Sequence, residues 1–239
     1  MSVKRSAIAA LALLGGLTDP ARAARDSVTL LYYERPPLHY TAADHKAAGT
    51  IVEITERALT DAGISFIWVA KPAKRLLNEV FDGPPNLCSP GWFLNDERRE
   101  KAIFSKPLMI DRPLIGVVNE SSKAKATGEA RGTFAAMGTI LVREHLTHGS
   151  YLEKVLSELP QTHIVQRTSI DVPSMLATVA AHHADLALMT EAEADYYIPQ
   201  AGPGLSIARF ADNVPDARHL ICSKQTDPDL IARINAAIK

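Results

Sequence analysis

The feature that most constrains the fold is a repeated order of strand-like and helix-like segments along the chain. Residues 28–33 form an apolar run of β-branched and aromatic side chains, which is typical of a strand. Residues 51–62 place apolar side chains at helical spacing and end at Gly63. The same order recurs in a predicted strand, helix and strand over 64–69, 72–80 and 86–89. This alternation predicts an α/β protein with a mainly parallel sheet.

A second alternation begins after a long extended stretch, residues 104–118. Pro107 and Pro113 interrupt that stretch, so it suits a chain that leaves one sheet for another better than it suits a central strand. The later segments predict strands over 133–137, 163–166 and 185–189, and helices over 140–148 and 172–182. A last strand and helix are too short for a third lobe and are expected to return to the first, over 219–223 and 228–238.

The first segment, residues 1–23, is typical of a secretory signal. It has a basic start at Lys4 and Arg5, an apolar run from Ala7 to Leu17, and a small-residue cleavage site at Ala21-Arg22-Ala23. The apolar run is too short for a bilayer-spanning helix, which needs ~20 residues, and no later run is longer. We therefore expect cleavage after Ala23 and a periplasmic chain without stable membrane insertion.

Charge and cysteine content narrow the class of partner. The formal net charge is −1, and removal of the basic leader makes the chain more acidic, so a nucleic-acid partner is not expected. Cys88 and Cys222 both lie in short apolar, strand-like runs. In an oxidising compartment they could form a disulfide, but buried strand cysteines also occur as plain small hydrophobes, and both alternatives stay open.

One region of the chain resembles a signature of the bacterial extracellular solute-binding proteins, family 3. Residues 91–101 read Gly-Trp-Phe-Leu-Asn-Asp-Glu-Arg-Arg-Glu-Lys, and 104–108 read Phe-Ser-Lys-Pro-Leu. Members of that family carry an arginine and a Phe-Ser-x-Pro run just before their interlobe crossover. Here Asn95 to Glu97 replace the usual hydroxyl and acid pair, and Leu108 replaces a tyrosine. Further segments match in the same order, at 33–39, Gly49, Gly138-Thr139 and 184–188.

The resemblance covers nearly the whole chain after the leader and implies a type II periplasmic binding protein fold. That fold has two lobes, each with a mixed, mainly parallel sheet, joined by two crossovers with the ligand between them. The implied division is a first lobe over 24–108, a second lobe over 109–217, and a return to the first over 218–239.

Arg98 is the first candidate for the ligand site. Its planar guanidinium matches a carboxylate with two parallel hydrogen bonds, and the resemblance places it where the family binds an α-carboxylate. From composition alone, Arg98 and Arg99 among acidic neighbours would instead be a solvated helix face. Gly138 and Thr139 are predicted to open a helix whose N–H groups bind the same anion, with an ordinary capped turn as the alternative.

Aromatic and acidic positions complete the candidate site. Tyr33 and Trp92 follow strand ends and could contact the ligand, or they could be packing residues. Thr190 stands where amino-acid-binding relatives carry an aspartate for the ligand's ammonium, and a neutral hydroxyl cannot neutralise that charge. Either Glu191 takes over through a one-residue shift, or the ligand is not an ordinary α-amino acid.

The resemblance implies a binding protein that captures a small polar, carboxylate-bearing molecule for import or sensing. Its expected partners are that small molecule and an ABC-type permease or a sensor, with the chain itself monomeric. No cofactor, metal or catalytic residue is expected, because His145, His148 and the other histidines lack a completing ligand set. The alternatives are an enzyme of cyclohexadienyl dehydratase type, using Glu34 or Glu191 as the acid, and an accessory or sensor domain without solute binding.

Overall fold

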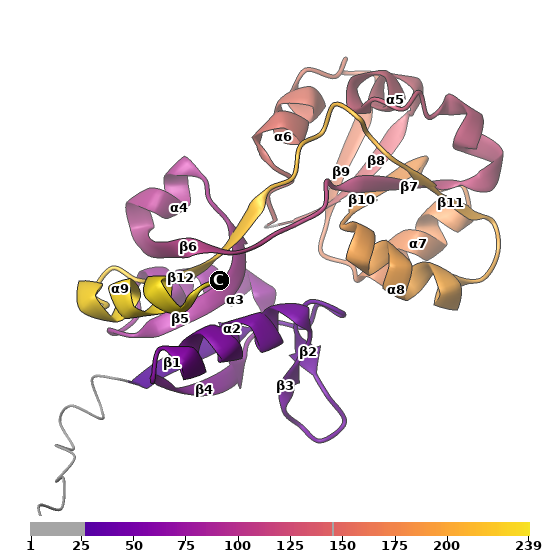
Figure 1. The fold of residues 1–239 in the computed structure, drawn as a ribbon. Coiled ribbons are helices and arrows are strands. Elements are labelled where there is room, and N and C mark those ends of the chain that lie inside the picture. The colour runs from indigo at the N-terminus through magenta and orange to yellow at the C-terminus, as the bar shows by residue number, and fades with distance from the viewer. Residues whose placement is uncertain (1–26, 145) are drawn as a thin grey trace, which may run out of the picture.

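The computed structural model describes residues 27–144 and 146–239, and the expected signal segment with its cleavage site lies outside the described residues. Two α/β lobes lie side by side and are joined by two crossover segments of the chain (Figure 1). The predicted two-lobed architecture with a mixed sheet in each lobe is confirmed. Among the described residues, no helix has both the length and the apolar character needed to cross a membrane.

The first lobe is built on a sheet with the strand order β4-β1-β5-β12-β6. Its strands are β1 (Ser27–Tyr32), β4 (Ser65–Ala70), β5 (Leu87–Phe93), β6 (Ala102–Ile110) and β12 (Ala217–Ser223). Its helices are α2 (Thr50–Asp61), α3 (Ala73–Phe81), α4 (Asp96–Lys101) and α9 (Pro228–Ala237), and a small hairpin is formed by β2 (Tyr40–Thr41) and β3 (Ala47–Ala48). The return of the chain therefore places β12 between β5 and β6.

The second lobe is built on a sheet with the strand order β11-β7-β10-β8-β9. Its strands are β7 (Ile115–Asn119), β8 (Thr139–Arg143), β9 (Ile164–Thr168), β10 (Leu186–Met189) and β11 (Leu205–Ala208). Its helices are α5 (Ala130–Ala136), α6 (Ser150–Ser157), α7 (Val172–Ala180), α8 (Glu191–Ala201) and the 3₁₀ helix η1 (Glu120–Lys125). In both sheets the strands that adjoin the crossovers run antiparallel to their neighbours, so antiparallel pairs are as numerous as parallel ones.

Along the inner strands of each sheet, alternating side chains are buried on the two opposite faces. In lobe 1, Leu30 and Leu220 pack under α2 and α9, whereas Leu31 and Ile221 pack under α3. Successive residues of a strand point to opposite faces, so one continuous apolar run supplies both cores. Lobe 2 is built in the same way. Ile140 and Leu186 pack with α5 and α6 on one face, while Leu141 and Ala187 pack with α7 on the other.

Two predicted elements of lobe 2 are wrong. Residues 133–137 lie in and just after helix α5 rather than in a strand, and residues 140–148 begin with strand β8 rather than forming a helix. The buried residues Ala130, Thr133, Phe134 and Met137 follow the spacing of a helix face, which the short apolar run concealed. Ile140 to Val142 are buried consecutively, as expected for a strand covered on both sides.

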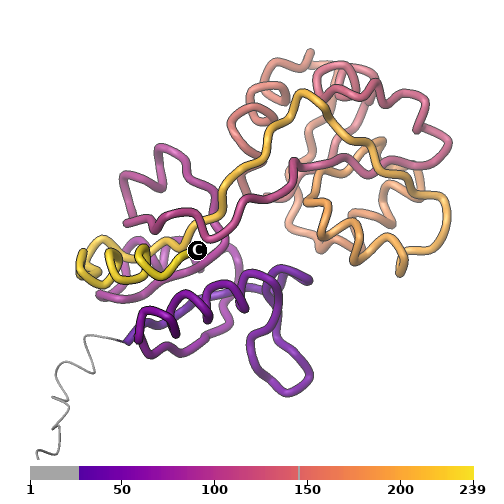
Figure 2. Tube along the Cα trace, in the orientation of Figure 1, coloured from indigo at the N-terminus to yellow at the C-terminus, as the bar shows by residue number. Residues whose placement is uncertain are grey.

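The two crossovers run next to each other between the lobes (Figure 2). The N–H group of Asp111 on the first crossover donates to the carbonyl of Asp216 on the second, at 2.9 Å. Arg218 fixes the pair to lobe 1, because its Nε donates to Asp111 Oδ2 and its Nη1 to the Gly91 carbonyl, both at 2.6 Å. These bonds hold both crossovers together and attach them to lobe 1 at one point.

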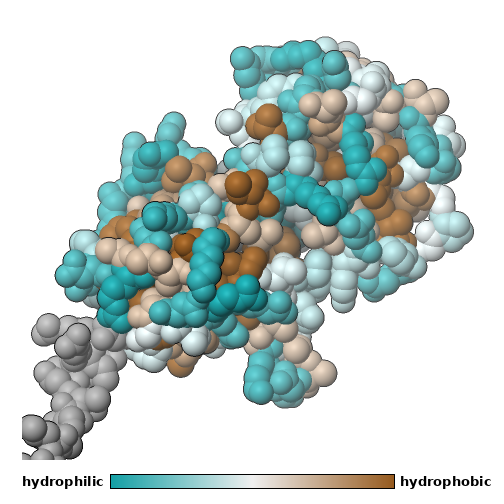
Figure 3. All heavy atoms as spheres, viewed as in Figure 1, coloured by the Kyte–Doolittle hydropathy of each residue, from teal (hydrophilic) through white to brown (hydrophobic). Residues whose placement is uncertain are grey.

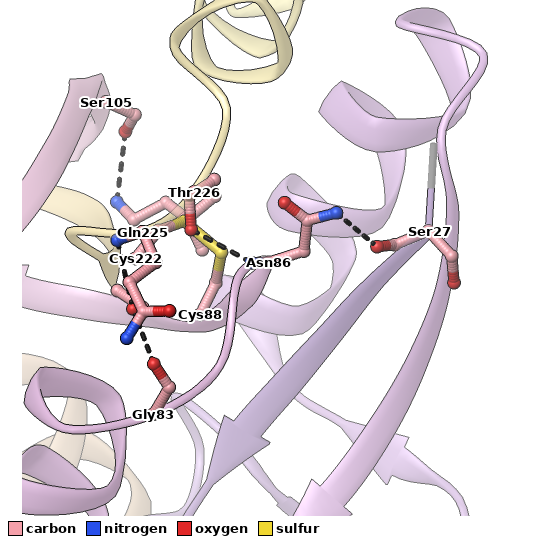
Figure 4. The surroundings of a disulfide bond; sticks show 10 residues. Ser27, Gly83, Asn86, Cys88, Ser105, Cys222, Gln225 and Thr226 are labelled. Carbon is pink, nitrogen blue, oxygen red and sulfur yellow. Dashed lines mark hydrogen bonds between the residues drawn. A yellow bond between two sulfur atoms is a disulfide. The ribbon is translucent and has the colours of Figure 1, made fainter. Parts of the chain in front are cut away.

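Cys88 and Cys222 form a disulfide between the neighbouring strands β5 and β12 (Figure 4). The bond links positions separated by 134 residues along the chain, and all of lobe 2 lies within the loop that it closes. Of the two alternatives that the sequence left open, the structure shows the disulfide. A crosslink that closes a loop of this length removes much of the conformational entropy of the unfolded chain.

Replacing both cysteines with alanine should lower the free energy of unfolding by about 2–5 kcal/mol, the range for loss of a native disulfide. Urea denaturation followed by circular dichroism measures the loss. The parent protein treated with a reductant serves as the control and should move toward the double variant. Equal stability of oxidised parent and double variant would contradict the prediction.

Candidate functional site

Three adjoining hollows lie between the lobes, on the side where the strands β1, β5 and β8 end. The largest, of about 790 Å³, is bounded by α3, the start of α4, and residues Leu146, Thr147 and Arg167 of lobe 2. A second, of about 420 Å³, is lined by residues 70–73, which lead into α3, and reaches Tyr33 and Arg143. A third is almost filled by side chains and shares Arg98 and Thr147 with the first and Tyr33 with the second. Together they form one interlobe cleft.

Arg98 lies on the wall between the largest and the filled hollow. The Asn95 side chain caps α4 by accepting from the Arg98 N–H at 2.8 Å, which places the arginine one turn into the helix. Its Nη1 donates to the Phe93 carbonyl at 2.8 Å and to Thr147 Oγ1 of lobe 2 at 3.3 Å. Only 5 % of Arg98 is exposed, and burial lowers the pKa of its guanidinium. None of the described carboxylates forms an ion pair with it, whereas Arg99 is exposed.

The aromatic candidates lie beside Arg98. The guanidinium lies over the Trp92 ring, 4.9 Å from its centroid, and Trp92 Nε1 donates to Ser89 Oγ at 2.8 Å. Tyr33 packs against Trp92 with ring centroids 5.9 Å apart. The structure thus brings Tyr33, Trp92 and Arg98 together at the cleft. The indole ring of Trp92 stabilises the Arg98 guanidinium, because the face of an indole attracts a positive charge.

A neutral histidine positions Tyr33. Burial, followed by the charge of Arg35, lowers the pKa of His39 to about 3, so this side chain is uncharged at neutral pH. Its Nδ1 lies 2.5 Å from the Tyr33 carbonyl, which can only accept, so the proton is on Nδ1. This bond fixes the chain where it leaves β1 and enters the cleft.

An ion pair that was not predicted from the sequence bridges the two lobes. Arg35, which follows β1 in lobe 1, donates from Nε and Nη2 to the two carboxylate oxygens of Glu193 on α8, at 2.8 and 3.0 Å. Arg143 of lobe 2 donates to the same carboxylate at 3.2 Å. Burial alone would raise the pKa of Glu193, but the charges and hydrogen bonds of Arg35 and Arg143 outweigh it and hold the pKa well below its usual range.

A sequence signal for Glu193 existed in the segment from Thr190 to Glu193. A hydroxyl followed three residues later by a glutamate is a capping box. This pattern predicts a helix start and a glutamate side chain that folds back to accept from the N–H of the capping residue. Thr190 has this role, since its Oγ1 accepts from the Glu193 N–H at 3.2 Å and donates to Glu193 Oε2 at 2.8 Å. The Thr190 hydroxyl therefore donates its only proton within lobe 2, as part of the cap of α8.

Glu191 and the pair Gly138 and Thr139 lie outside the three hollows. Glu191 accepts from Arg112 at 3.1 Å and from Arg209, both of which lie on the crossovers. The N–H groups of Gly138 and Thr139 donate to the Asp185 carboxylate at 2.9 and 2.8 Å, at the start of β8 rather than at a helix start. The opposite end of β8 faces the cleft, where Thr147 contacts Arg98.

No cluster of three or more histidine, cysteine, aspartate or glutamate side chains that could hold a metal ion occurs within residues 27–144 and 146–239. The face of the molecule in Figure 3 intersperses hydrophilic and hydrophobic residues over both lobes. The lining of the largest hollow combines charged and amide side chains with apolar ones such as Leu77 and Phe81.

Two α/β lobes joined by two crossovers, with polar side chains in the cleft between them, define the type II periplasmic binding protein fold. The chain belongs to the bacterial extracellular solute-binding proteins, family 3, whose family model matches residues 29–239. Comparison with curated protein sequences found no match.

Solved structures share the fold at low sequence identity. The arginine-binding protein of T. maritima in its holo form has 17 % identity and a TM-score of 0.69, with 92 % of each chain covered. A substrate-binding protein of an ABC uptake transporter from Streptococcus pneumoniae, with bound histidine, has 19 % identity and a TM-score of 0.69, covering 91 % of this chain and 87 % of that one. An ancestral amino-acid-binding protein, described as a precursor of cyclohexadienyl dehydratase, has 14 % identity, a TM-score of 0.70, and coverage of 92 % and 90 %.

Proposed function

We propose that the protein is a periplasmic receptor that captures a small carboxylate-bearing solute between its lobes and presents it to an ABC-type permease or a sensor. The observation that carries the proposal is the state of Arg98, a nearly buried cation at the cleft that pairs with no described carboxylate. A buried charge is costly unless a counter-charge meets it. A solute carboxylate next to Arg98 supplies that counter-charge when the lobes close.

The acidic groups near the cleft favour a solute without an α-ammonium group. Glu193 already accepts from Arg35, Arg143 and Thr190, so its oxygens are engaged by the protein. Glu191 is paired with Arg112 and Arg209 at the crossovers. An ammonium brought to this part of the cleft would therefore compete with an existing ion pair, which makes an organic acid a better ligand than an ordinary amino acid.

Binding is a better account of the cleft than acid catalysis. A dehydratase needs a carboxylic acid that is protonated near neutral pH, which requires a raised pKa. Hydrogen bonds from Arg209 and Arg112 instead keep the pKa of Glu191 below its ordinary range. Glu34 lines the smaller hollow, but its carboxylate accepts from the N–H and hydroxyl of Thr41. The lowered pKa of Glu191 favours its ionised form, and the Glu34 carboxylate is already engaged by Thr41 within lobe 1.

A thermal-shift screen of the mature protein should show stabilisation by organic acids. A solute at a hundred times its dissociation constant adds about 2.7 kcal/mol to the stability of the folded state. Small mono- and dicarboxylates are the test set, and the cationic amino acids arginine and lysine are the controls that a cleft with uncompensated arginine should reject. Stabilisation by arginine or lysine alone would contradict the preference for a solute without an ammonium group, and stabilisation by none of these carboxylates would contradict the proposed function.

A further inference from the structure

The lobe 1 wall of the largest hollow carries two further cations, Lys74 and Arg75, in the first turn of α3. Both side chains are exposed, and neither forms an ion pair within the part of the chain that the structure describes. Lys71, just before the helix, differs because its Nζ lies 2.8 Å from a carboxylate oxygen of Glu79. The charges of Lys74 and Arg75 are therefore directed at the hollow without compensation.

Two other charged residues that line the same hollow, Arg167 and Glu97, each form an ion pair with a residue outside it. Arg167 lies 2.8 Å from a carboxylate oxygen of Glu153, and Glu97 lies 2.7 Å from Lys101. Three cations that line this hollow form no ion pair with a described carboxylate, namely Lys74, Arg75 and Arg98. Cations that share a low-dielectric concavity repel one another and raise the local concentration of anions. One carboxylate compensates Arg98 and leaves the other two unmatched.

We propose that the solute is an organic dianion, with one carboxylate on Arg98 and its second anionic group on Lys74 and Arg75. This inference rests on the proposed function and adds a second anion subsite on α3. The arginine fork and the lysine ammonium suit a second carboxylate or a phosphonate equally, since both are planar or compact oxygen anions. The hollow of about 790 Å³ falls within the ~300–1,000 Å³ of small-molecule sites, so it has room for a chain that links two charged ends.

Calorimetric titration with matched probes tests the second subsite. The dicarboxylates succinate, glutarate and adipate are each compared with their monoamides, which keep the size and lose one charge, and 3-phosphonopropionate tests the alternative anionic end. At low salt the best dianion should bind about tenfold or more tightly than its monoamide, equivalent to ~1.4 kcal/mol. The preference should fall as salt is added, because Lys74 and Arg75 are exposed and screened.

The double variant Lys74→Gln with Arg75→Gln should bring the dianion close to the affinity of the monoamide while leaving the monoamide itself within about threefold. The matched control is Lys123→Gln with Lys125→Gln, which removes two exposed charges from η1, outside the three hollows. Circular dichroism confirms that each variant is folded.

Each outcome of the titration decides the matter. Loss of the dianion preference in the α3 variant but not in the η1 variant supports the second subsite. A preference that both variants keep, or a parent that binds monoamides as tightly as dianions, overturns the second subsite while leaving the proposed function intact. A parent that binds none of these anions overturns both.

Discussion

Replacing Glu193 with alanine is expected to lower the free energy of unfolding by about 3–5 kcal/mol, the range for breaking a buried ion pair on one side. The Glu193 side chain has no exposed surface, and Arg35, which it pairs with across the lobes, is 8 % exposed. Removal of the carboxylate leaves the guanidinium buried without its counter-charge. Chemical denaturation monitored by tryptophan fluorescence measures the loss.

The control for this variant is Glu97→Ala, which breaks the solvent-exposed pair with Lys101. Exposed pairs contribute about 0–1 kcal/mol, so the control should remain close to the parent. Equal losses in both variants would show that the interlobe pair is not a stabilising contact. In the parent, Glu193 has a pKa below its unfolded value, so its contribution is present above the ordinary glutamate range and is lost as the pH falls below it.

Arg98→Ala should weaken the binding of an anionic solute by about 2–5 kcal/mol, roughly 30-fold to several thousand-fold, because a desolvated carboxylate loses its fork partner. Calorimetric titration with the best anion from the thermal-shift screen measures the change. Arg98→Lys keeps the charge but loses the paired geometry, so it should recover only part of the affinity.

Arg99→Ala is the matched control, since Arg99 is the next residue of the same helix and is exposed. It should bind the anion as the parent does. Undiminished binding by a folded Arg98→Ala variant would remove the main support for an anion receptor, and exchanged behaviour of the two variants would assign the site to Arg99.

Most of the fold could be predicted because its signals are local and repeated. Helix α2 and strand β4 match segments whose apolar spacing distinguishes a period of 3.6 from a period of two. The region from α5 to β8 could not be assigned in this way, since apolar runs as short as residues 134–137 and 140–142 suit a buried helix turn and a buried strand equally. Because residues 140–148 were predicted to be a helix, Gly138 and Thr139 were placed at a helix start, whereas they lie at the start of strand β8.

The candidate site was only partly predictable for a different reason. Arg98 follows from a pattern within a few residues, and its neighbour Trp92 lies on the adjoining strand. The pair of Arg35 and Glu193 joins positions 158 residues apart, and nothing in either local segment indicates the other. Long-range ion pairs depend on how two lobes meet, which local periodicity does not encode.

The position of β12 between β5 and β6 has a consequence for the order in which the chain can fold as its residues become available from the N-terminus onward. Lobe 2 is contiguous from Ile115 to Ala208, so every strand of its sheet is present before the last thirty or so residues appear. The sheet of lobe 1 lacks the strand between β5 and β6 until β12 (Ala217–Ser223) is available. The N-terminal half must therefore wait for the C-terminus, and the lobe synthesised second is the first that can be completed.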